Sequence, residues 1–229
     1  MKKVLITGAS GYIGSHIIVA LCKTAKYQIV ALDDGSNSDI ELTQSKLRTI
    51  CKDFELFNET FPSHFYQLDL RSWSEVNDNI LSGVDVVIHC AGWKSVNESV
   101  ENALSYYDNN VCGTVKLLQA MERKNVRKIV FSSSATVYGV PETLPINENS
   151  AVKPTNPYGQ TKAMIEQMIK DVSKSSQKVK AVLLRYFNPC GGHESALIGE
   201  MPKGVPNNLQ PYIAQVASGK RKCLNVFGN

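Results

Sequence analysis

The chain has 229 residues, of which 43% are hydrophobic and 20% are charged, and its formal net charge at pH 7 is +4. This is the composition of an ordinary globular protein, and it argues against a nucleic-acid-binding one. The densest basic clusters, at residues 124–128 and 219–223, are short and lack interleaved aromatic residues. We therefore interpret both clusters as solvated surface.

The six cysteines are scattered along the chain, and none has the spacing of a zinc site. Scattered cysteines in a chain of this size are typical of reduced thiols, so we expect a cytoplasmic protein without a metal. The apolar stretch at residues 4–6 is broken at once by Thr7 and Gly8, and no run reaches transmembrane length. We therefore expect neither an export segment nor a membrane partner.

Six short apolar runs rich in Val and Ile predict strands that are buried on both faces of a sheet. They lie at residues 4–7, 28–33, 65–69, 84–91, 128–133 and 181–187. Longer segments with helical periodicity lie between them. This alternation predicts a doubly wound parallel sheet of the α/β class, which binds ligands beyond the carboxyl ends of its strands.

Two helical segments have a clear apolar stripe. The first stripe consists of Val100, Leu104, Tyr107, Val111, Val115 and Leu118, and the second of Ile165, Met168, Ile169 and Val172. Both stripes predict helices that pack on the sheet. Residues 209–220 predict a further amphipathic helix, and residues 188–208 are rich in Gly and Pro, which indicates a long loop.

Gly8, Gly11 and Gly14 follow the first predicted strand, directly before a helix that we expect to begin near Tyr12. Multiplying 229 positions by the cube of the glycine frequency, 15/229, gives about 0.06 chance matches. Glycine lets a ligand approach the backbone closely, and a helix N-terminus attracts a pyrophosphate. We interpret the stretch as a dinucleotide-binding turn, with a bare turn between strand and helix as the alternative.

Asp33 ends the second predicted strand, 19 residues after Gly14. A carboxylate at this place accepts hydrogen bonds from the ribose hydroxyls of a dinucleotide. It would also repel a 2′-phosphate, and Asp34 adds to that repulsion. The pair predicts NAD rather than NADP as the cofactor, although a helix-capping role for Asp33 is a competing interpretation.

Tyr158 and Lys162 are four residues apart and therefore share one face of the helix that follows the fifth strand. An ammonium group, together with a cationic nicotinamide, favours a phenolate, so we expect the pKa of Tyr158 to be lowered. Tyr158 would then act as a base, and Ser134 would donate a hydrogen bond to the same substrate oxygen. Capping of the strand end is the alternative role for Ser134.

The chain resembles the UDP-galactose 4-epimerases of the extended short-chain dehydrogenase/reductase family along its whole length, in segments such as GYIGSH, YYDNNVCGT, FSSSATVYG and PYGQTK. The resemblance implies that Ser134, Tyr158 and Lys162 are catalytic. It places NAD against Tyr12, Ile13, Asp33, Asn37, Asp69, Leu70, Cys90, Ala91, Gly92, Lys94, Asn109 and Phe187, in addition to the glycine turn, Asp34, Ser132, Tyr158 and Lys162. It places a UDP-sugar against Lys94, Ser134, Tyr158, Asn188, Asn208 and Leu209.

The resemblance also implies a Rossmann-type NAD-binding domain at residues 1–188 and the incomplete beginning of a smaller substrate-binding lobe at 189–229. In such enzymes NAD takes a hydride from C4 of the sugar and returns it to the opposite face. Dehydratases of this fold carry an Asp–Glu pair where this chain has Ala135 and a neighbouring polar residue. Two alternatives stay open: a catalytically weak NAD-binding relative, and another NAD-dependent nucleotide-sugar epimerase or decarboxylase.

Related epimerases pair the helices near residues 100–121 and 158–174 into a four-helix bundle, so we expect a homodimer. We expect Leu117, Met121 and Met164 to lie beyond the core face of these helices.

Family members continue beyond residue 229 with arginines that hold the diphosphate. We therefore expect this chain to retain NAD, to bind UDP-sugars poorly and to epimerise slowly or not at all. Glu194, Ala196 and Met201 depart from the family pattern in the loop near the substrate. We expect the apolar residues near the end of the chain to be partly uncovered, namely Ile213, Val216, Val226 and Phe227.

Overall fold

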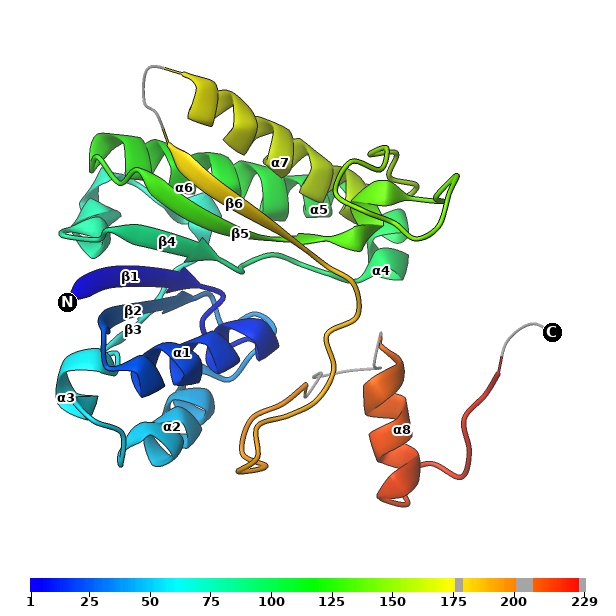
Figure 1. Cartoon of the computed structure of the whole chain (residues 1–229), viewed down its shortest axis with the longest axis horizontal. Helices are drawn as coiled ribbons and strands as arrows, with labels where there is room; N and C mark the ends of the chain where they lie inside the picture. The colour runs from blue at the N-terminus through cyan, green and yellow to red at the C-terminus, as the bar shows by residue number, and fades with distance from the viewer. Residues whose placement is uncertain (176–178, 201–207, 227–229) are drawn as a thin grey trace.

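The computed structural model describes residues 1–175, 179–200 and 208–226. Its centre is a sheet of six parallel strands in the order β3-β2-β1-β4-β5-β6 (Figure 1). The strands are β1 Lys2–Thr7, β2 Tyr27–Asp33, β3 Phe65–Gln67, β4 Val86–His89, β5 Lys128–Ser134 and β6 Lys180–Tyr186. This confirms the predicted fold class, and the strand order places the topological switch point between β1 and β4.

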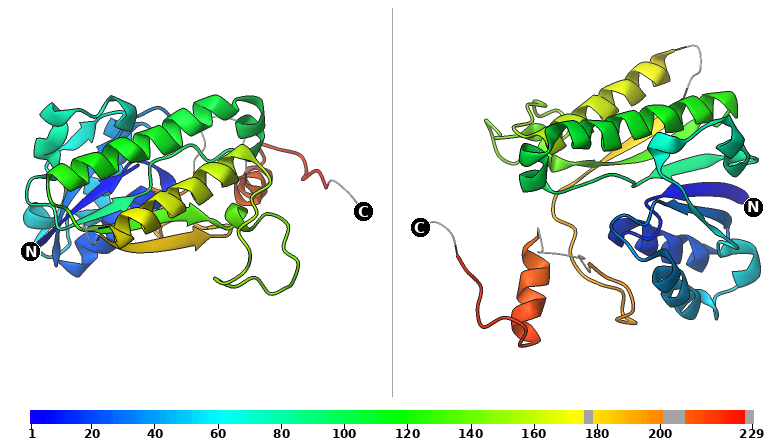
Figure 2. Two further views of the ribbon diagram at one scale, coloured as in Figure 1. Left: turned by 90° about the horizontal axis from the view of Figure 1, so that it is seen from above. Right: turned by 180° about the vertical axis from the view of Figure 1, so that it is seen from behind.

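Helices cover both faces of the sheet (Figures 1 and 2). One layer contains α1 Tyr12–Thr24, α2 Ile40–Cys51 and α3 Phe57–Thr60. The other contains α4 Val96–Glu101, α5 Ala103–Tyr106, the π-helical segment η3 Tyr107–Cys112, α6 Gly113–Arg123 and α7 Pro157–Lys174. The short 3-10 helices are η1 Leu70–Ser72, η2 Glu75–Leu81 and η4 Ala135–Tyr138, and α8 Leu209–Ala217 follows the loop after β6. Within the described ranges, no helix has the length and apolar character needed to cross a bilayer.

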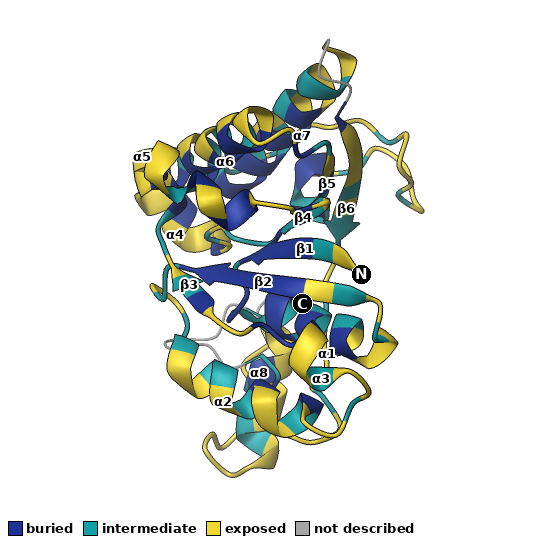
Figure 3. Cartoon of the chain, turned by 90° about the vertical axis from the view of Figure 1, so that its left-hand side faces the viewer, coloured by how far each residue is buried: buried dark blue, intermediate teal, exposed yellow. Residues whose placement is uncertain are grey.

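Alternate residues of each central strand enter different cores, as expected for a sheet that is covered on both sides. Leu5 of β1 packs in the cluster under α6 and α7. Its neighbours Val4 and Ile6 pack in the cluster under α1 and α2. Figure 3 shows β1 and β2 as largely buried strands between the two layers.

β6 is not buried on both faces, and the prediction was wrong for this strand. Val182 is 53% exposed and Leu184 is 37% exposed, whereas Leu183 on the opposite face packs against the core under α6 and α7. The cause lies in the layer of α1, α2 and α3, which packs against β1, β2 and β3. The sequence pattern of an apolar strand is the same whether or not a layer of helices covers its second face, so the pattern could not predict this exposure.

The apolar stripe predicted at residues 100–118 is only partly the buried face of its helices, since Val111 and Leu118 pack against the core but its first two members do not. Val100 and Leu104 are 64% and 85% exposed. The buried positions include Tyr106, Asn110 and Leu117 instead. This face looks hydrophilic in the sequence because it includes polar side chains such as Asn110. Asn110 can be buried because its amide makes hydrogen bonds inside the protein.

Two residues expected beyond the core face, Leu117 and Met121, are therefore misassigned. They are 0% and 1% exposed and belong to the core under α6 and α7. Met164, by contrast, is 44% exposed, as expected. The predicted uncovering near the end of the chain is confirmed for Ile213 and Val226, and Val216 is half-buried, while Phe227 lies outside the described residues.

A buried ion pair fixes α7 to the sheet. The carboxylate of Glu166, a residue that is 1% exposed, accepts hydrogen bonds from Arg185 Nε at 2.9 Å and Nη2 at 2.7 Å. It also accepts a hydrogen bond of 2.6 Å from Ser133 Oγ. Burial raises the pKa of Glu166, but the hydrogen bonds from Arg185 and Ser133 outweigh burial and hold that pKa below its usual value. The charged carboxylate therefore joins α7 to both β5 and β6.

We predict that Glu166→Gln lowers the free energy of unfolding by about 3–5 kcal/mol, because it leaves the Arg185 guanidinium without its counter-charge. Chemical denaturation at neutral pH measures this change. The contribution of Glu166 is present above the unfolded-state pKa of a glutamate and is lost as the pH falls through the lower folded-state pKa. Glu142→Gln removes the exposed Glu142–Lys153 pair and should change stability little, so equal effects of the two substitutions would contradict this account.

Candidate functional site

The turn after β1 brings β1, α1 and the end of β4 unusually close together. Gly8 has φ +68°, and a Cβ there would lie 2.7 Å from the backbone nitrogen of Ala91. A Cβ at Gly14 would lie 2.1 Å from the Gly8 carbonyl oxygen, while one at Gly11 would meet that oxygen at 3.3 Å. Packing therefore demands Gly8 and Gly14, whereas Gly11 chiefly leaves room next to the turn.

Two cavities lie beside this turn at the carboxyl edge of the sheet. The first cavity has a volume of about 120 Å³. Its lining includes most of the predicted NAD contacts: Gly8, Gly11, Asp33, Asp34, Asn37, Asp69, Leu70, Cys90, Ala91, Gly92 and Asn109. The second cavity, of about 560 Å³, is lined by Gly11, Tyr12, Asn37 and Lys94 among others. The structure thus gathers residues from the ends of β1, β2 and β4, as the sequence predicted.

The start of α1 faces the second cavity. Its N-cap residue Gly11 provides no side-chain cap, so the first turn keeps N–H groups for a ligand, and Ile13 and Gly14 lie in that turn. Tyr12 donates a hydrogen bond of 2.8 Å to the Gly191 carbonyl. Burial raises the pKa of the Tyr12 phenol, and the negative charge of Glu200 adds to this rise. This helix start suits a diphosphate group.

Asp33 is 6% exposed and is held rigidly at the end of β2. Its Oδ2 accepts a hydrogen bond from the Ser10 backbone at 3.0 Å, and its Oδ1 accepts from Gly35 at 3.0 Å and Ser38 Oγ at 2.9 Å. The helix-capping interpretation of Asp33 was wrong, because Asp39 caps α2 by accepting from the Leu42 backbone. The carboxylate of Asp33 instead borders the first cavity.

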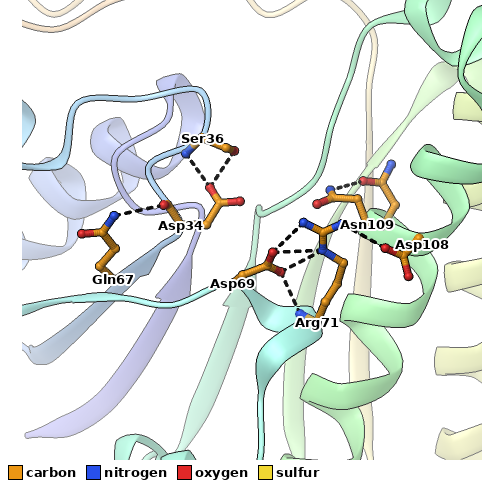
Figure 4. A network of polar contacts seen from close by, with 8 residues as sticks. Asp34, Ser36, Gln67, Asp69, Arg71, Asp108 and Asn109 are labelled. Atoms are coloured by element: carbon orange, nitrogen blue, oxygen red, sulfur yellow. Dashed lines mark hydrogen bonds and ion pairs between the residues drawn. The ribbon is translucent and has the colours of Figure 1, made fainter.

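Arg71, which the sequence did not single out, joins two walls of the first cavity (Figure 4). Its guanidinium donates to both oxygens of Asp69, at distances from 2.6 to 3.1 Å. It also donates to Asp108 of η3 at 2.9 Å, next to Asn109. The hydrogen bond from Arg71 holds the pKa of Asp69 below its usual range. Asp69 is therefore a charged, oriented acceptor in the cavity wall.

The three predicted catalytic residues come together at the end of β5. Ser134 ends that strand, and Tyr158 and Lys162 lie one turn apart at the start of α7, which Asn156 caps by accepting from the Gly159 backbone at 2.8 Å. Lys162 Nζ donates to the Ser132 carbonyl at 2.9 Å and lies 5.9 Å from the centre of the Tyr158 ring. Ser132 Oγ in turn donates to Cys90 Sγ at 3.2 Å.

The lowered pKa predicted for Tyr158 depends on the nicotinamide cation together with Lys162, so for the chain alone it stays a prediction. Burial raises the pKa of Tyr158, and the hydrogen bond with Ser134 lowers it only in part. Burial also lowers the pKa of Lys162 to about 8. In the chain alone, desolvation therefore outweighs the hydrogen bond with Ser134 and keeps the pKa of the phenol above its ordinary value. The predicted phenolate therefore depends on the positive charge of the nicotinamide as well as on Lys162.

Ser134 has the capping role as well as a place in the trio. Its Oγ accepts hydrogen bonds from the Thr136 backbone at 3.2 Å and from Thr136 Oγ1 at 2.9 Å, which begins η4. Both interpretations of this serine are compatible, because its hydroxyl hydrogen remains available for a second contact.

The remaining predicted residues are not gathered into these cavities. Phe187 is 59% exposed and Leu209 is 66% exposed. Asn188 is also exposed, and none of the three lines either cavity. Asn208 is half-buried at the start of α8 and donates a hydrogen bond to Glu200. The structure therefore assembles the predicted cofactor side more completely than the predicted substrate side.

Asn110 is a structural residue of the site that the prediction missed. Its Oδ1 accepts from the Trp93 backbone at 2.8 Å, and its Nδ2 donates to Trp93 O and to Thr161 Oγ1, both at 3.1 Å. It thus ties the loop after β4 to α7, and it lies in the π-helical segment, a feature often found at functional sites. The doublet Asn109–Asn110 was the available signal in the sequence.

Comparison with known proteins places this geometry in context. The profile of the NAD dependent epimerase/dehydratase family matches residues 4–229. UDP-glucose 4-epimerase of Bacillus subtilis (strain 168) is 49% identical over 227 residues, which are 99% of this chain and 64% of that protein.

Solved structures agree in fold. A UDP-glucose-4-epimerase from Stenotrophomonas maltophila, solved with bound NAD and formylated UDP-arabinopyranose, is 41% identical and matches with a TM-score of 0.91 over 100% of this chain and 65% of its own. The enzyme from Bifidobacterium longum, solved with NAD⁺ and UDP, is 41% identical with a TM-score of 0.85 over 96% of this chain and 64% of its own. The chain therefore spans less than two thirds of the length of these relatives.

We predict that two glycine substitutions in the turn separate packing from ligand binding. Gly14→Ala should lower the free energy of unfolding by at least about 1–3 kcal/mol, because its Cβ meets backbone atoms. Gly11→Ala should change stability less but should weaken binding of the predicted dinucleotide by about tenfold. Thermal unfolding and NAD titration measure the two effects, and a Gly11→Ala variant with unchanged NAD affinity would favour a bare turn.

Proposed function

Because the chain belongs to the NAD dependent epimerase/dehydratase family, we propose that it binds NAD and carries the catalytic residues of an enzyme that interconverts UDP-galactose and UDP-glucose. The observation that carries this proposal is the meeting of Ser134, Tyr158 and Lys162 at one edge of the sheet. The same edge holds the cavity lined by Asp33 and Asp69. The trio and the cavity together favour cofactor-assisted chemistry on a bound ligand.

The residues present fit NAD. The uncapped start of α1, with Gly11 beside it, suits the diphosphate, and the fixed carboxylate of Asp33 suits the hydroxyls of the adenosine ribose. The carboxylate of Asp69 and the amide of Asn109 line the cavity that would take the adenine. Lys162 would contact the nicotinamide ribose.

The trio supplies acid–base chemistry at the sugar 4-hydroxyl. NAD, when bound, supplies hydride acceptance and return at C4 of the sugar. Tyr158 as the phenolate takes the proton of the 4-hydroxyl, and Ser134 donates a hydrogen bond to the same oxygen. With a pKa of about 8, Lys162 is mostly protonated at neutral pH, so its charge stays within the site. Ala135 and Thr136, which follow Ser134 in η4, offer no carboxylate for dehydration.

We further propose that the protein forms a homodimer through the outer face of α5, α6 and α7. The apolar stripe that the structure leaves outward includes Leu104, which is 85% exposed, and Met164, which is 44% exposed. Beside it, a hollow of about 310 Å³ is lined by Val115, Leu118, Met168 and Val172 among others. A second copy of the chain would bury both features in a helical bundle, as the sequence predicted.

The cofactor proposal predicts selectivity between two dinucleotides. NAD should bind at least about tenfold more tightly than NADP, because Asp33 and Asp34 repel a 2′-phosphate. Titration of the cofactor-free chain with each dinucleotide measures the ratio. Equal dissociation constants would remove the role assigned to the two carboxylates.

The catalytic proposal predicts a loss of turnover without a loss of cofactor. Tyr158→Phe should reduce kcat by about 10² or more, the effect of a lost general base, and should leave NAD affinity nearly unchanged. A coupled assay for UDP-glucose formation from UDP-galactose measures turnover, both in this chain and in a form extended to the length of its relatives. Nearly full activity of the Tyr158→Phe variant would make the tyrosine merely structural.

The dimer proposal predicts a change in molecular mass on one substitution. Sedimentation at micromolar concentration should give a dimer for the wild-type chain and a larger monomer fraction for Leu104→Glu, which places a charge on the proposed interface. Leu42→Glu on α2, where Leu42 is 50% exposed, is the matched control. A wild-type monomer would contradict the proposal.

A further inference from the structure

One carboxylate joins the cofactor side of the molecule to the segment that follows β6. Glu200 Oε1 accepts a hydrogen bond of 2.9 Å from Lys94 Nζ and a second hydrogen bond from Asn208 Nδ2. Lys94 lies in the loop after β4, whereas Asn208 is the N-cap residue of α8. The two donors are 114 positions apart in the chain, and they meet on a single oxygen atom.

The side chain of Glu200 is buried, unlike that of a surface ion-pair partner. The Glu200 side chain is 8% exposed, and Ile198, two residues earlier, is buried in the core under α1 and α2. The preceding loop is bound to α1 by the hydrogen bond from Tyr12 to Gly191, and it closes on itself through a bridge between Gly192 and Gly199. The loop is therefore anchored to the nucleotide-binding domain, while the carboxylate reaches α8.

The second oxygen of the carboxylate has no partner in the described part of the chain. Glu200 Oε2 is buried without a hydrogen bond, and Glu200 lines the second cavity with Gly11, Tyr12 and Lys94. An unsatisfied buried acceptor is costly, so this atom is suited to a donor such as a ribose hydroxyl of a bound nucleotide. Lys94 also has capacity left, because an ammonium has three N–H donors and Glu200 takes one.

We propose that Glu200 is a positioning residue that couples NAD binding to the placement of α8, by holding Lys94 and Asn208 on one carboxylate. The inference rests on the proposed function, because Lys94 and Glu200 line the second cavity beside the start of α1 that is assigned to the NAD diphosphate, and the resemblance places a UDP-sugar against Asn208. A dinucleotide that fixes Lys94 also fixes Glu200, and Glu200 fixes the first residue of α8. The coupling is reciprocal, so a ligand that orders α8 strengthens cofactor binding by the same factor.

Amide hydrogen exchange of the whole chain, with and without NAD⁺, tests this coupling. In the wild type, NAD⁺ should slow exchange both in α1, where the cofactor binds, and in α8. In Glu200→Gln, which keeps the side-chain volume but removes the charge, the slowing in α1 should persist. The slowing in α8 should fall by at least about fivefold, the lower range of coupling between sites. Asn208→Ala breaks the other contact and should have the same effect on α8.

Glu142→Gln is the matched control, since it removes a glutamate from an exposed ion pair that lines neither cavity, and it should behave as the wild type. Equal slowing of α8 in Glu200→Gln and in the wild type would overturn the coupling while leaving NAD binding intact. A wild-type chain in which NAD⁺ slows exchange in α1 but not in α8 would also overturn the coupling. A wild-type chain in which NAD⁺ slows neither helix would overturn the proposed function and, with it, the role of Glu200.

Discussion

The lack of a side chain at two glycines determines how the carboxyl edge of the sheet is built. At Gly8 and Gly14 a Cβ would collide with backbone atoms of Ala91 and of Gly8 itself. Backbone atoms have no rotamers with which to move aside, so a side chain at either position would push α1 away from β1 or β1 away from β4. The close approach determines how near the α1 N-terminus lies to the sheet, and Gly11 at that N-terminus lines both cavities.

The reacting side of the edge depends on a different kind of constraint. α7 carries Tyr158 and Lys162 into surroundings where burial raises the pKa of the phenol and lowers that of the ammonium. Desolvation of this kind opposes charge on both groups. The two groups stay buried only because α7 cannot move away from the sheet. Glu166 supplies that fixation one turn further along, through Arg185 and Ser133. The structure therefore places a stabilising ion pair next to a pair of groups whose charges burial disfavours.

Local patterns were enough to predict much of this architecture. The Val- and Ile-rich runs located all six strands, and the glycine spacing together with Asp33 located the first cavity, because each signal is contained in a short stretch. The contacts that complete the site could not be read in this way. Arg71 meets Asp108 across 37 positions and Lys94 meets Glu200 across 106, so each pairing exists only once the sheet is folded. The buried face that runs through α5, η3 and α6 was missed since it contains satisfied polar residues such as Asn110.

The uncovered face of β6 affects how this chain behaves in concentrated solution. Val182, Leu184 and the neighbouring Phe187 expose apolar atoms at the end of the sheet, where molecules can adhere to one another. Only electrostatic repulsion opposes this adhesion at long range, and the net charge of +4 at pH 7 makes it weak. The repulsion declines further as lysines lose protons at alkaline pH and as added salt shortens its range to about 10 Å or less. Mildly acidic buffers of low ionic strength, which raise the positive charge and preserve its reach, are therefore the conditions of greatest colloidal stability.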